Sequence, residues 1–520
     1  MAKLTLPPPA TGVATTLRDA AAARSWLAAQ APGQHLRMAR ALLPELRAVD
    51  ASDAAPAIRF EILEELRGAV IEAEEGIEAR FARKPLPMLE EENAIFQTAW
   101  QLWHALAIAY LRIVPMLPAA QMLPAMHRAA IALRETLYCH YLAGMEAEPS
   151  LLPLLYELLL TAESMRLQRS PVSDPHLRYL GESTIAGDIA WAMLLHFCDP
   201  YRFSPAQFVV ANRALSRWRD LANFQPQPDE DPKAKAISLA AWLPEELLAS
   251  GGPRWLEVKQ VVRKLRKRVE SIESGESTEQ LKLGRDLTGA AAARLLRDID
   301  KQLRQHPREI GDVIDLPAVD VVFGHNHLYT LLTGKSLHSE VLSTASSTIS
   351  HERIALFGFD NAANRIDIAK PMEIPSEKWA VEESWVLRPA PAGAQVVGPT
   401  LVGIRNMTSE DTPRLAILFD LRLTVDGWLS GKLRLLPQPA STGLQVVQAP
   451  APGKPAQRVP AFFLPADEKT EQPVSICLQT GSGLREGSLL SLEESPVEHL
   501  RLREVIERGS NYIRFAYART

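Results

Sequence analysis

Apolar residues recur at every third or fourth position from about residue 14 to residue 306, and at every second position in stretches after about residue 370. The first spacing places apolar side chains on one face of a helix, and the second places them on one face of a strand. This change of pattern predicts an α+β multidomain protein, in which N-terminal all-α helical bundles are followed by a C-terminal antiparallel β-barrel.

Several helices have clear signals. Residues 91–113 carry apolar side chains on more than one face, which predicts a helix buried among neighbours. Ser204 and Gln207 flank a proline and form the start signal of another helix, because serine caps the first turn and glutamine completes a capping box. Two amphipathic helices are expected over residues 255–269 and 287–303.

The clearest strand covers residues 415–425, where every second side chain is apolar. An Asp-Gly pair at 426–427 is a hairpin turn signal, and the alternation resumes at 433–435. A long strand, a tight turn and a returning strand are typical of a small antiparallel barrel. Two further strands are expected at 474–478 and 513–517.

Composition shifts and clusters of proline and glycine divide the chain. The predicted segments are a loose N-terminal arm (1–13), a helical bundle (14–225), a linker (226–236), a second helical segment (237–310), a mixed connector (311–370), a β-barrel (371–450) and a C-terminal β extension (451–520).

A chain of 520 residues is too long for one hydrophobic core, in keeping with several domains. The net charge of −5 argues against a general nucleic-acid-binding protein. No apolar run is long enough for a signal peptide or a membrane span. Cys139, Cys198 and Cys477 are isolated in the sequence, which is typical of free buried thiols in a reducing compartment. We therefore expect a cytoplasmic protein without a cofactor.

One stretch resembles a metal site. Residues 324–327 read Gly-His-Asn-His, and 311–315 read Gly-Asp-Val-Ile-Asp, as in binuclear metallophosphoesterases. Those enzymes need further ligands between the two motifs, and the spacing here leaves no room for them. Coincidence is the preferred interpretation, so no metal is predicted. A metallophosphoesterase-like enzyme using Asp312, His325 and His327 is kept as a third hypothesis.

The densest positive run lies on the first of the two amphipathic helices. Its residues are Arg263, Lys264, Arg266, Lys267 and Arg268. A solvated helix face is the default interpretation of such a run. The functional alternative is a patch that docks an acidic protein partner or a phosphate-bearing ligand.

The C-terminal third resembles a divergent PilZ domain, the small β-barrel that binds cyclic di-GMP in bacteria. The resemblance is carried by residues 379–386, by residues 401–405 and by the hairpin at 426–427. The helical part, including Asp-Pro-Tyr-Arg-Phe-Ser-Pro at 199–205, resembles the helical region of larger bacterial proteins that end in such a barrel. The segment 371–450 is therefore expected to be PilZ-like.

The PilZ family binds its ligand with an Arg-x-x-x-Arg motif and an Asp/Asn-x-Ser-x-x-Gly motif. Here Glu382-x-Ser384-x-x-Leu387 occupies the second motif's place, and no Arg-x-x-x-Arg precedes it. The resemblance implies Glu382, Ser384 and Arg388 as ligand positions. Without the paired arginines, each charge-assisted contact of about 1.5–3 kcal/mol is lost, so we expect cyclic di-GMP binding to be absent or altered. The alternative for Ser384 is a strand hydroxyl that binds no ligand and only satisfies local hydrogen bonds.

The resemblance implies a non-enzymatic bacterial signalling effector or adaptor, with a degenerate cyclic di-GMP receptor-type barrel and a helical region that binds a protein partner. The alternative is a helical scaffold that binds proteins and takes no small ligand.

Overall fold

The structure is a computed structural model in which the chain divides into two compact units. The first comprises Met1–Glu309 with the turn Arg422–Gly427, and the second comprises Ile310–Leu421 with Trp428–Thr520. The residues that the structure describes are 4–228, 236–240, 242–249, 251–305, 316–335, 374–405, 412–447, 457–466, 472–492 and 499–519.

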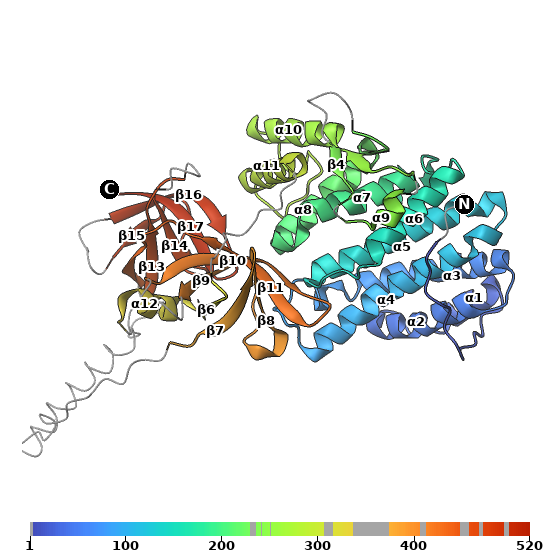
Figure 1. The fold of residues 1–520 in the computed structure, drawn as a ribbon, viewed down its shortest axis with the longest axis horizontal. Coiled ribbons are helices and arrows are strands. Elements are labelled where there is room, and N and C mark those ends of the chain that lie inside the picture. Colours follow the sequence, from blue (N-terminus) through green and yellow to red (C-terminus); the bar gives the residue numbers. More distant parts are fainter. Residues whose placement is uncertain are drawn as a thin grey trace, which may run out of the picture. The chain divides into compact units, whose positions relative to one another are not determined.

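The first unit is helical and corresponds to the blue-to-green part of Figure 1. Its main helices are α1 (Ala20–Ala28), α2 (His35–Ala51), α3 (Pro56–Glu75), α4 (Glu90–Ile113), α5 (Ala119–Ala143), α6 (Leu151–Ser164), α7 (Ile185–Phe197), α8 (Pro205–Trp218), α9 (Glu245–Ala249), α10 (Lys259–Glu273) and α11 (Gly289–Gln305). Short 3-10 turns include η1 (Glu78–Arg80) and η5 (Arg219–Leu221).

The core of this unit lies between long helices that run side by side. Helices α4 and α5 bury apolar residues on several faces, as expected from the sequence of residues 91–113. Leu106 of α4 and Leu133 of α5 are fully buried in one continuous cluster. Helix α5 ends at Gly144, whose φ of 70° places it in the left-handed conformation that glycine adopts at low cost. Among the described residues, no helix combines the length and the apolar character needed to cross a bilayer.

The predicted start of α8 is confirmed. The Ser204 hydroxyl accepts a hydrogen bond from the backbone N–H of Gln207, and the Gln207 side chain accepts one from the N–H of Ser204. The two amphipathic helices are also present as α10 and α11, which pack against each other (Figure 1).

The prediction for α10 is wrong at its start. Trp255 lies in strand β5 (Trp255–Glu257), and α10 begins at Lys259. Strand β5 is the middle strand of a small sheet and pairs on both sides, with β3 (Asn223–Gln225) and β4 (Ala236–Ser238). These backbone pairings, which join distant segments, override the helical spacing of Trp255. A second short pair, β1 (Val172–Ser173) with β2 (Glu182–Ser183), lies near α5 and α7.

The second unit contains a closed antiparallel barrel, which confirms the predicted fold class. Its strand order is β10-β11-β8-β7-β6-β9. The strands are β6 (Ala318–Phe323), β7 (Glu377–Glu382), β8 (Trp385–Pro389), β9 (Thr400–Arg405), β10 (Arg414–Leu423) and β11 (Trp428–Leu435). Strand β6 comes from the segment 311–370 that the sequence assigned to a connector, and β7 and β9 pair with it on either side.

The predicted hairpin at 415–435 is present as β10 and β11. Strand β10 is buried on both faces from Leu415 to Leu421. Leu415, Ile417 and Phe419 belong to a cluster that also contains Phe462 and other residues of the second sheet. The alternation in the sequence therefore marks the face of β10 that meets this second sheet.

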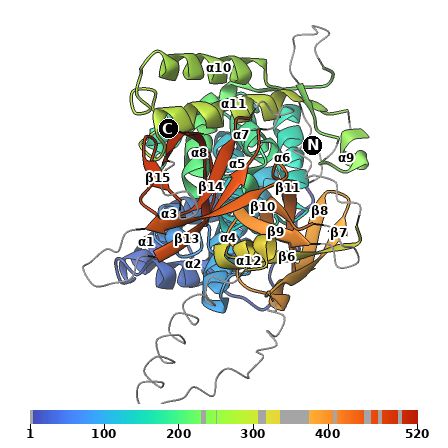
Figure 2. The same ribbon diagram turned by 90° about the vertical axis from the view of Figure 1, so that its left-hand side faces the viewer.

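The second sheet has the strand order β12-β13-β14-β17-β16-β15. Its strands are β12 (Ser441–Val447), β13 (Gln457–Leu464), β14 (Ser475–Gln479), β15 (Leu489–Ser491), β16 (His499–Arg508) and β17 (Tyr512–Arg519). Strands β14 and β17 confirm the strands predicted at 474–478 and 513–517. Helix α12 (His325–Thr333) lies beside β6 and β9 in both ribbon views (Figures 1 and 2).

The turn between β16 and β17 holds the second sheet to the barrel. The Asn511 side chain accepts from the Leu401 N–H at 2.8 Å and donates to the Leu401 carbonyl at 3.1 Å. The Ser510 N–H donates to the Pro399 carbonyl at 2.7 Å. One turn thus completes the backbone hydrogen bonds at the start of β9, so the two sheets share a fixed joint.

Candidate functional site

The predicted ligand residues lie on the β7–β8 hairpin of the barrel. Glu382 ends β7 and is exposed, whereas Ser384 is half-buried in the two-residue turn that connects the strands. Glu383, the other turn residue, has a φ of 53°. The Ser384 hydroxyl therefore lies at the end of a hairpin and not along a strand.

Arg388 lies farther along β8 and is only 1% exposed. Its guanidinium forms an ion pair with Glu377 at 2.8 Å and donates to the carbonyl of Ala390 at 2.9 Å. Its guanidinium carbon lies 5.2 Å from the centre of the Trp379 ring. Burial lowers the pKa of Arg388, and the Glu377 carboxylate partly opposes that shift. A ligand phosphate would have to displace Glu377, so ligand binding by Arg388 stays a prediction.

A buried ion pair, which was not predicted from the sequence, lies next to this hairpin. The Lys432 ammonium lies 2.8 Å from the Asp420 carboxylate, and both side chains are at most 2% exposed. The same ammonium lies 4.4 Å from the centre of the Trp385 ring. The sequence does carry an indication of this pair, namely a lysine and an aspartate inside otherwise apolar strands. Such charges are buried only when they are paired.

The positive run forms one face of α10. Val261, Val262, Leu265 and Val269 are buried, whereas Arg263, Lys264, Arg266 and Lys267 are exposed and Arg268 is half-buried. Arg266 lies 3.4 Å from the Asp300 carboxylate of α11. The structure thus confirms an amphipathic helix with a positive outer face, and partner binding by this face stays a prediction.

The metal hypothesis concerned three residues. Asp312 lies outside the described residues. His325 begins α12, is buried beside the Phe462 ring, and has its pKa lowered to about 4 by burial. The Nδ1 atom of His327, whose side chain is exposed, lies 3.0 Å from the Phe323 carbonyl. Within the described part of the chain, no three His, Cys, Asp or Glu side chains are grouped as metal ligands.

The helical unit brings together a serine, a histidine and an aspartate that are far apart in sequence. The His127 Nε2 atom lies 2.6 Å from the Ser183 hydroxyl and 3.2 Å from the Asp188 carboxylate. The Nδ1 atom faces the Arg128 guanidinium at 3.0 Å. Since a guanidinium only donates, Nδ1 must accept and Nε2 must carry the proton.

This tautomer gives the trio a structural role. A histidine protonated at Nε2 donates to the serine oxygen and does not accept its proton, as nucleophilic catalysis requires. His127 and Asp188 are fully buried, and Ser183 is 4% exposed. The Ser183 hydroxyl in turn donates to the Asp188 carboxylate at 3.1 Å, so the three side chains are linked to one another inside the core.

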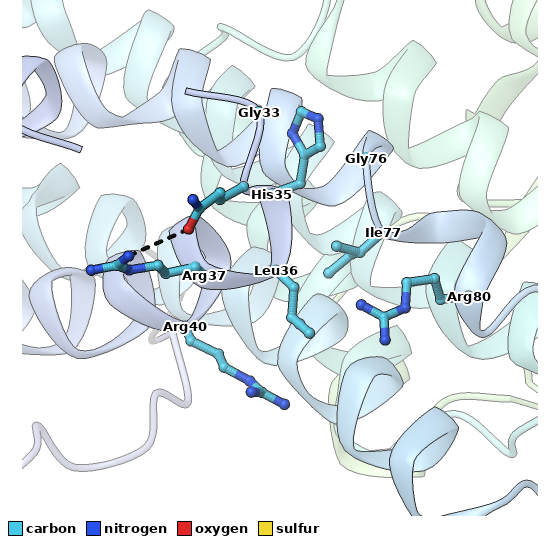
Figure 3. Close-up of a pocket in the computed structure, with 9 residues that line it drawn as sticks. Gly33, His35, Leu36, Arg37, Arg40, Gly76, Ile77 and Arg80 are labelled. Atoms are coloured by element: carbon cyan, nitrogen blue, oxygen red, sulfur yellow. Dashed lines mark hydrogen bonds between the residues drawn. The ribbon is translucent and has the colours of Figure 1, made fainter. Parts of the chain in front are cut away.

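A cavity of about 510 Å³ opens between the start of α2 and the end of α3. Figure 3 shows the side chains that line it. They are those of Gln34, His35, Leu36, Arg37, Arg40, Ile77 and Arg80, and the backbone of Gly33 and Gly76 completes the wall. These arginines could not be predicted from the sequence, because they come from two separate segments that only the fold brings together.

Leu36 and Ile77 are the apolar side chains of the lining, and Arg40 and Arg80 come to it from two different segments of the chain (Figure 3). Arg37 points in another direction, and its guanidinium donates to the Gln34 side chain at 3.4 Å. The His35 ring lies directly against Gly76. A Cβ atom at that glycine would be 2.1 Å from the His35 Cγ atom. Because residue 76 has no side chain, the His35 ring can lie here and form part of the cavity wall.

A family model matches part of the helical unit. The family model described as "Cyclic-di-GMP receptor FimW, N-terminal domain" matches residues 21–229, which is less than half of the chain. Searches of curated proteins and of solved structures gave no significant match. The matched residues run from α1 to the segment after β3 and include the arginine-lined cavity. Over its main helical region, the chain is therefore similar to the N-terminal domain of a cyclic di-GMP receptor.

Proposed function

We propose that this protein is a non-enzymatic signalling effector of the cyclic di-GMP receptor type. The observation that carries the proposal is the match of residues 21–229 to the N-terminal domain of such a receptor. The closed antiparallel barrel of the second unit agrees with a PilZ-like module after the helices. The matched family is one of receptors, and the buried Ser183-His127-Asp188 trio does not have the proton arrangement of a hydrolase.

In this proposal the β7–β8 hairpin is a reduced ligand site. Ser384 offers a hydroxyl at the turn, and exposed Glu382 can accept hydrogen bonds from a guanine edge. Arg388 is held by Glu377, and Lys432 is paired with Asp420, so neither cation is available without breaking an ion pair. The hairpin alone therefore provides weak phosphate binding.

Calorimetric titration of the full chain with cyclic di-GMP tests the receptor function. Micromolar binding, with GMP giving no comparable heat, is the expected result. Ser384→Ala should weaken binding if the hairpin takes part. No heat at millimolar cyclic di-GMP would rule out the receptor function.

The positive face of α10 favours a second candidate, a helical scaffold that binds an acidic protein. Arg263, Lys264 and Lys267 are exposed, and no ion pair is recorded for them within the described residues. Because exposed cations of one sign attract acidic surfaces, reversing all three to Glu should reduce partner capture in pull-down experiments. A matched control reverses Arg485, Arg501 and Arg503, three exposed arginines of the second unit. Equal capture by both triple variants would refute a role for α10.

A further inference from the structure

The arginine-lined cavity between α2 and η1 has the composition of an anion site. We propose that it binds a phosphate group of a nucleotide, with Arg40 and Arg80 as the two phosphate ligands and Leu36 and Ile77 as the apolar side chains of the lining. This inference rests on the proposed function where it identifies the nucleotide as cyclic di-GMP, and it assigns that ligand to a site outside the barrel.

The charge of the cavity is unbalanced. Three arginines and one histidine line it, and none of its nine lining residues is acidic. Arg40 is exposed, and no ion pair or hydrogen bond of its side chain is recorded within the described residues. Guanidinium groups suit phosphate because their N–H donors match its oxygens in pairs. A bound phosphate would bring a negative charge to this lining.

Arg80 has a counter-ion that a ligand can replace. Its guanidinium lies 2.6 Å from the Glu91 carboxylate, but the two side chains are 44% and 75% exposed. Exposed ion pairs of this kind contribute little to stability, because water screens both charges. Arg80 can therefore turn from Glu91 to a phosphate, and Glu91 acts as a competitor for the site.

The backbone acts in both directions: the start of α2 favours an anion, whereas the carboxyl end of α3 at Gly76 disfavours one. Helix α2 has 17 residues, and its N-cap residue Gln34 makes no side-chain hydrogen bond to the first turn. The N–H groups of that turn stay available at the cavity, where the helix dipole favours an anion. This contribution accompanies the arginines, which are the principal feature of the site.

Size and chemistry fit a nucleotide better than a bare ion. A volume of about 510 Å³ lies within the range of small-molecule sites, which combine apolar lining with a few polar groups. Leu36, which is half-buried, can contact a base or sugar while Arg40 and Arg80 hold the phosphate, whereas Ile77 is only 1% exposed and belongs to the core of the helical unit. The cavity lies entirely within residues 21–229, the part of the chain similar to the receptor domain.

The test compares three probes on the full chain by calorimetric titration: cyclic di-GMP, GTP and inorganic pyrophosphate. The main variant is Arg40→Glu with Arg80→Glu, which should weaken binding of the effective probe at least tenfold. The matched control is Arg18→Glu with Arg503→Glu, which makes the same change in net charge at exposed positions outside the cavity and should bind as the wild type does.

Two further variants act on the cavity without adding negative charge. Glu91→Gln removes the competitor of Arg80 and should tighten binding severalfold. Gly76→Ala places a methyl group against His35, and should weaken binding by shifting that wall. Tightening by Glu91→Gln is an outcome that mere damage to the fold would not produce.

The outcomes separate the cavity from the receptor function. Binding of cyclic di-GMP that is lost in the double Arg variant and kept in the control supports both. Undiminished binding of cyclic di-GMP by the double Arg variant overturns the cavity assignment alone. Binding of GTP or pyrophosphate, but not cyclic di-GMP, that depends on Arg40 and Arg80 supports the cavity and overturns the receptor function. No binding of any probe overturns both.

Discussion

Two buried carboxyl groups of the helical unit lie in opposite environments. Asp174 is 3% exposed and accepts two hydrogen bonds from the Arg67 guanidinium. Burial raises its pKa, but the Arg67 hydrogen bond and the charges of Arg67 and Arg128 outweigh burial and lower the pKa overall. Glu74 is 4% exposed and faces the Cys139 thiol at 3.7 Å. Burial, and then the negative charge of Glu78, raises the pKa of Glu74 to about 8.

Glu74 should make the helical unit less stable in alkaline solution. Its folded pKa of about 8 lies above the ordinary value of 4.5, so its protonated form is the one that the fold accommodates. The contribution of Glu74 to the free energy of unfolding is complete below about pH 4.5. It is lost as the pH rises to about 8, because a buried negative charge must then form. Glu74→Gln should remove this loss, which is on the order of a few kcal/mol, from the free energy of unfolding.

Thermal unfolding at pH 6 and pH 9 measures the effect. Glu61→Gln is the matched control, because Glu61 is an exposed carboxylate of the same helix. A wild-type protein that is equally stable at both pH values, or a Glu61→Gln variant that behaves as Glu74→Gln does, would contradict this assignment.

Removing one partner of the Arg67–Asp174 pair should be costly. Arg67→Met leaves a buried carboxylate with the more distant Arg128, at 3.4 Å, as its remaining cation. Breaking such a pair typically costs about 3–5 kcal/mol. The double variant Arg67→Met with Asp174→Leu should recover most of that loss in urea unfolding, because no unpaired charge is then buried. If the double variant is no more stable than Arg67→Met, the cost of Arg67→Met does not come from the unpaired charge of Asp174.

At the residue scale, the sequence placed Ser384 on a strand, whereas it lies in the two-residue turn between β7 and β8. The sequence could not show that Arg388 is buried against Glu377, or that Lys432 is paired with Asp420. These pairings depend on barrel register and on burial. The arginines of the cavity could not be predicted either, since Arg40 and Arg80 line one cavity only after α2 and α3 have packed together.

At the scale of elements, local signals gave correct predictions. The cap of α8 and the β10–β11 hairpin are specified within a few neighbouring residues, and both are confirmed. Strand β6 was not predicted, because its place in the barrel depends on pairing with β7 and β9 across long stretches of chain. Trp255 was assigned to the wrong element for the same reason.

The joint between the second sheet and the barrel leads to a prediction about Gly509. A Cβ atom there would lie 2.2 Å from a ring carbon of Tyr512 and 2.5 Å from the Pro399 carbonyl oxygen. Since a backbone carbonyl cannot move without shifting the start of β9, Gly509→Ala should destabilise the second unit by about 3 kcal/mol.

Calorimetry of the full chain measures this change as a lower unfolding temperature. Gly289→Ala is the control, because a Cβ atom at that position meets only one carbon, at 3.4 Å. It should leave the unfolding temperature unchanged or raise it slightly. A Gly509→Ala variant as stable as the wild type would mean that the turn does not fix the two sheets together.

On the scale of the whole molecule, each unit has its own hydrophobic core. Buried Leu106 belongs to the cluster of the helical unit, and buried Ile417 belongs to the cluster shared by the barrel and the second sheet. The domain boundaries predicted from sequence stay predictions, whereas the order of a helical part before a β part is confirmed. Composition and periodicity reveal that order because each class of core needs its own spacing of apolar residues.

Separate cores should give separate unfolding transitions. Leu106→Ala and Ile417→Ala each open a cavity that typically costs about 2–5 kcal/mol. We expect differential scanning calorimetry of the full chain to show two transitions, with each substitution lowering only one of them. If both substitutions lower the same single transition, the two units unfold as one cooperative body.

The three cysteines have a practical consequence for all these experiments. Cys139, Cys198 and Cys477 are free and buried, as the sequence predicted, and burial raises the pKa of each thiol, that of Cys477 to about 12. Because thiolates are the species that react, the native chain should be nearly silent towards maleimide dyes at neutral pH. A single cysteine introduced at an exposed position beside the α2 cavity would then carry the only fluorophore, and ligand occupancy could be followed optically without altering the rest of the molecule.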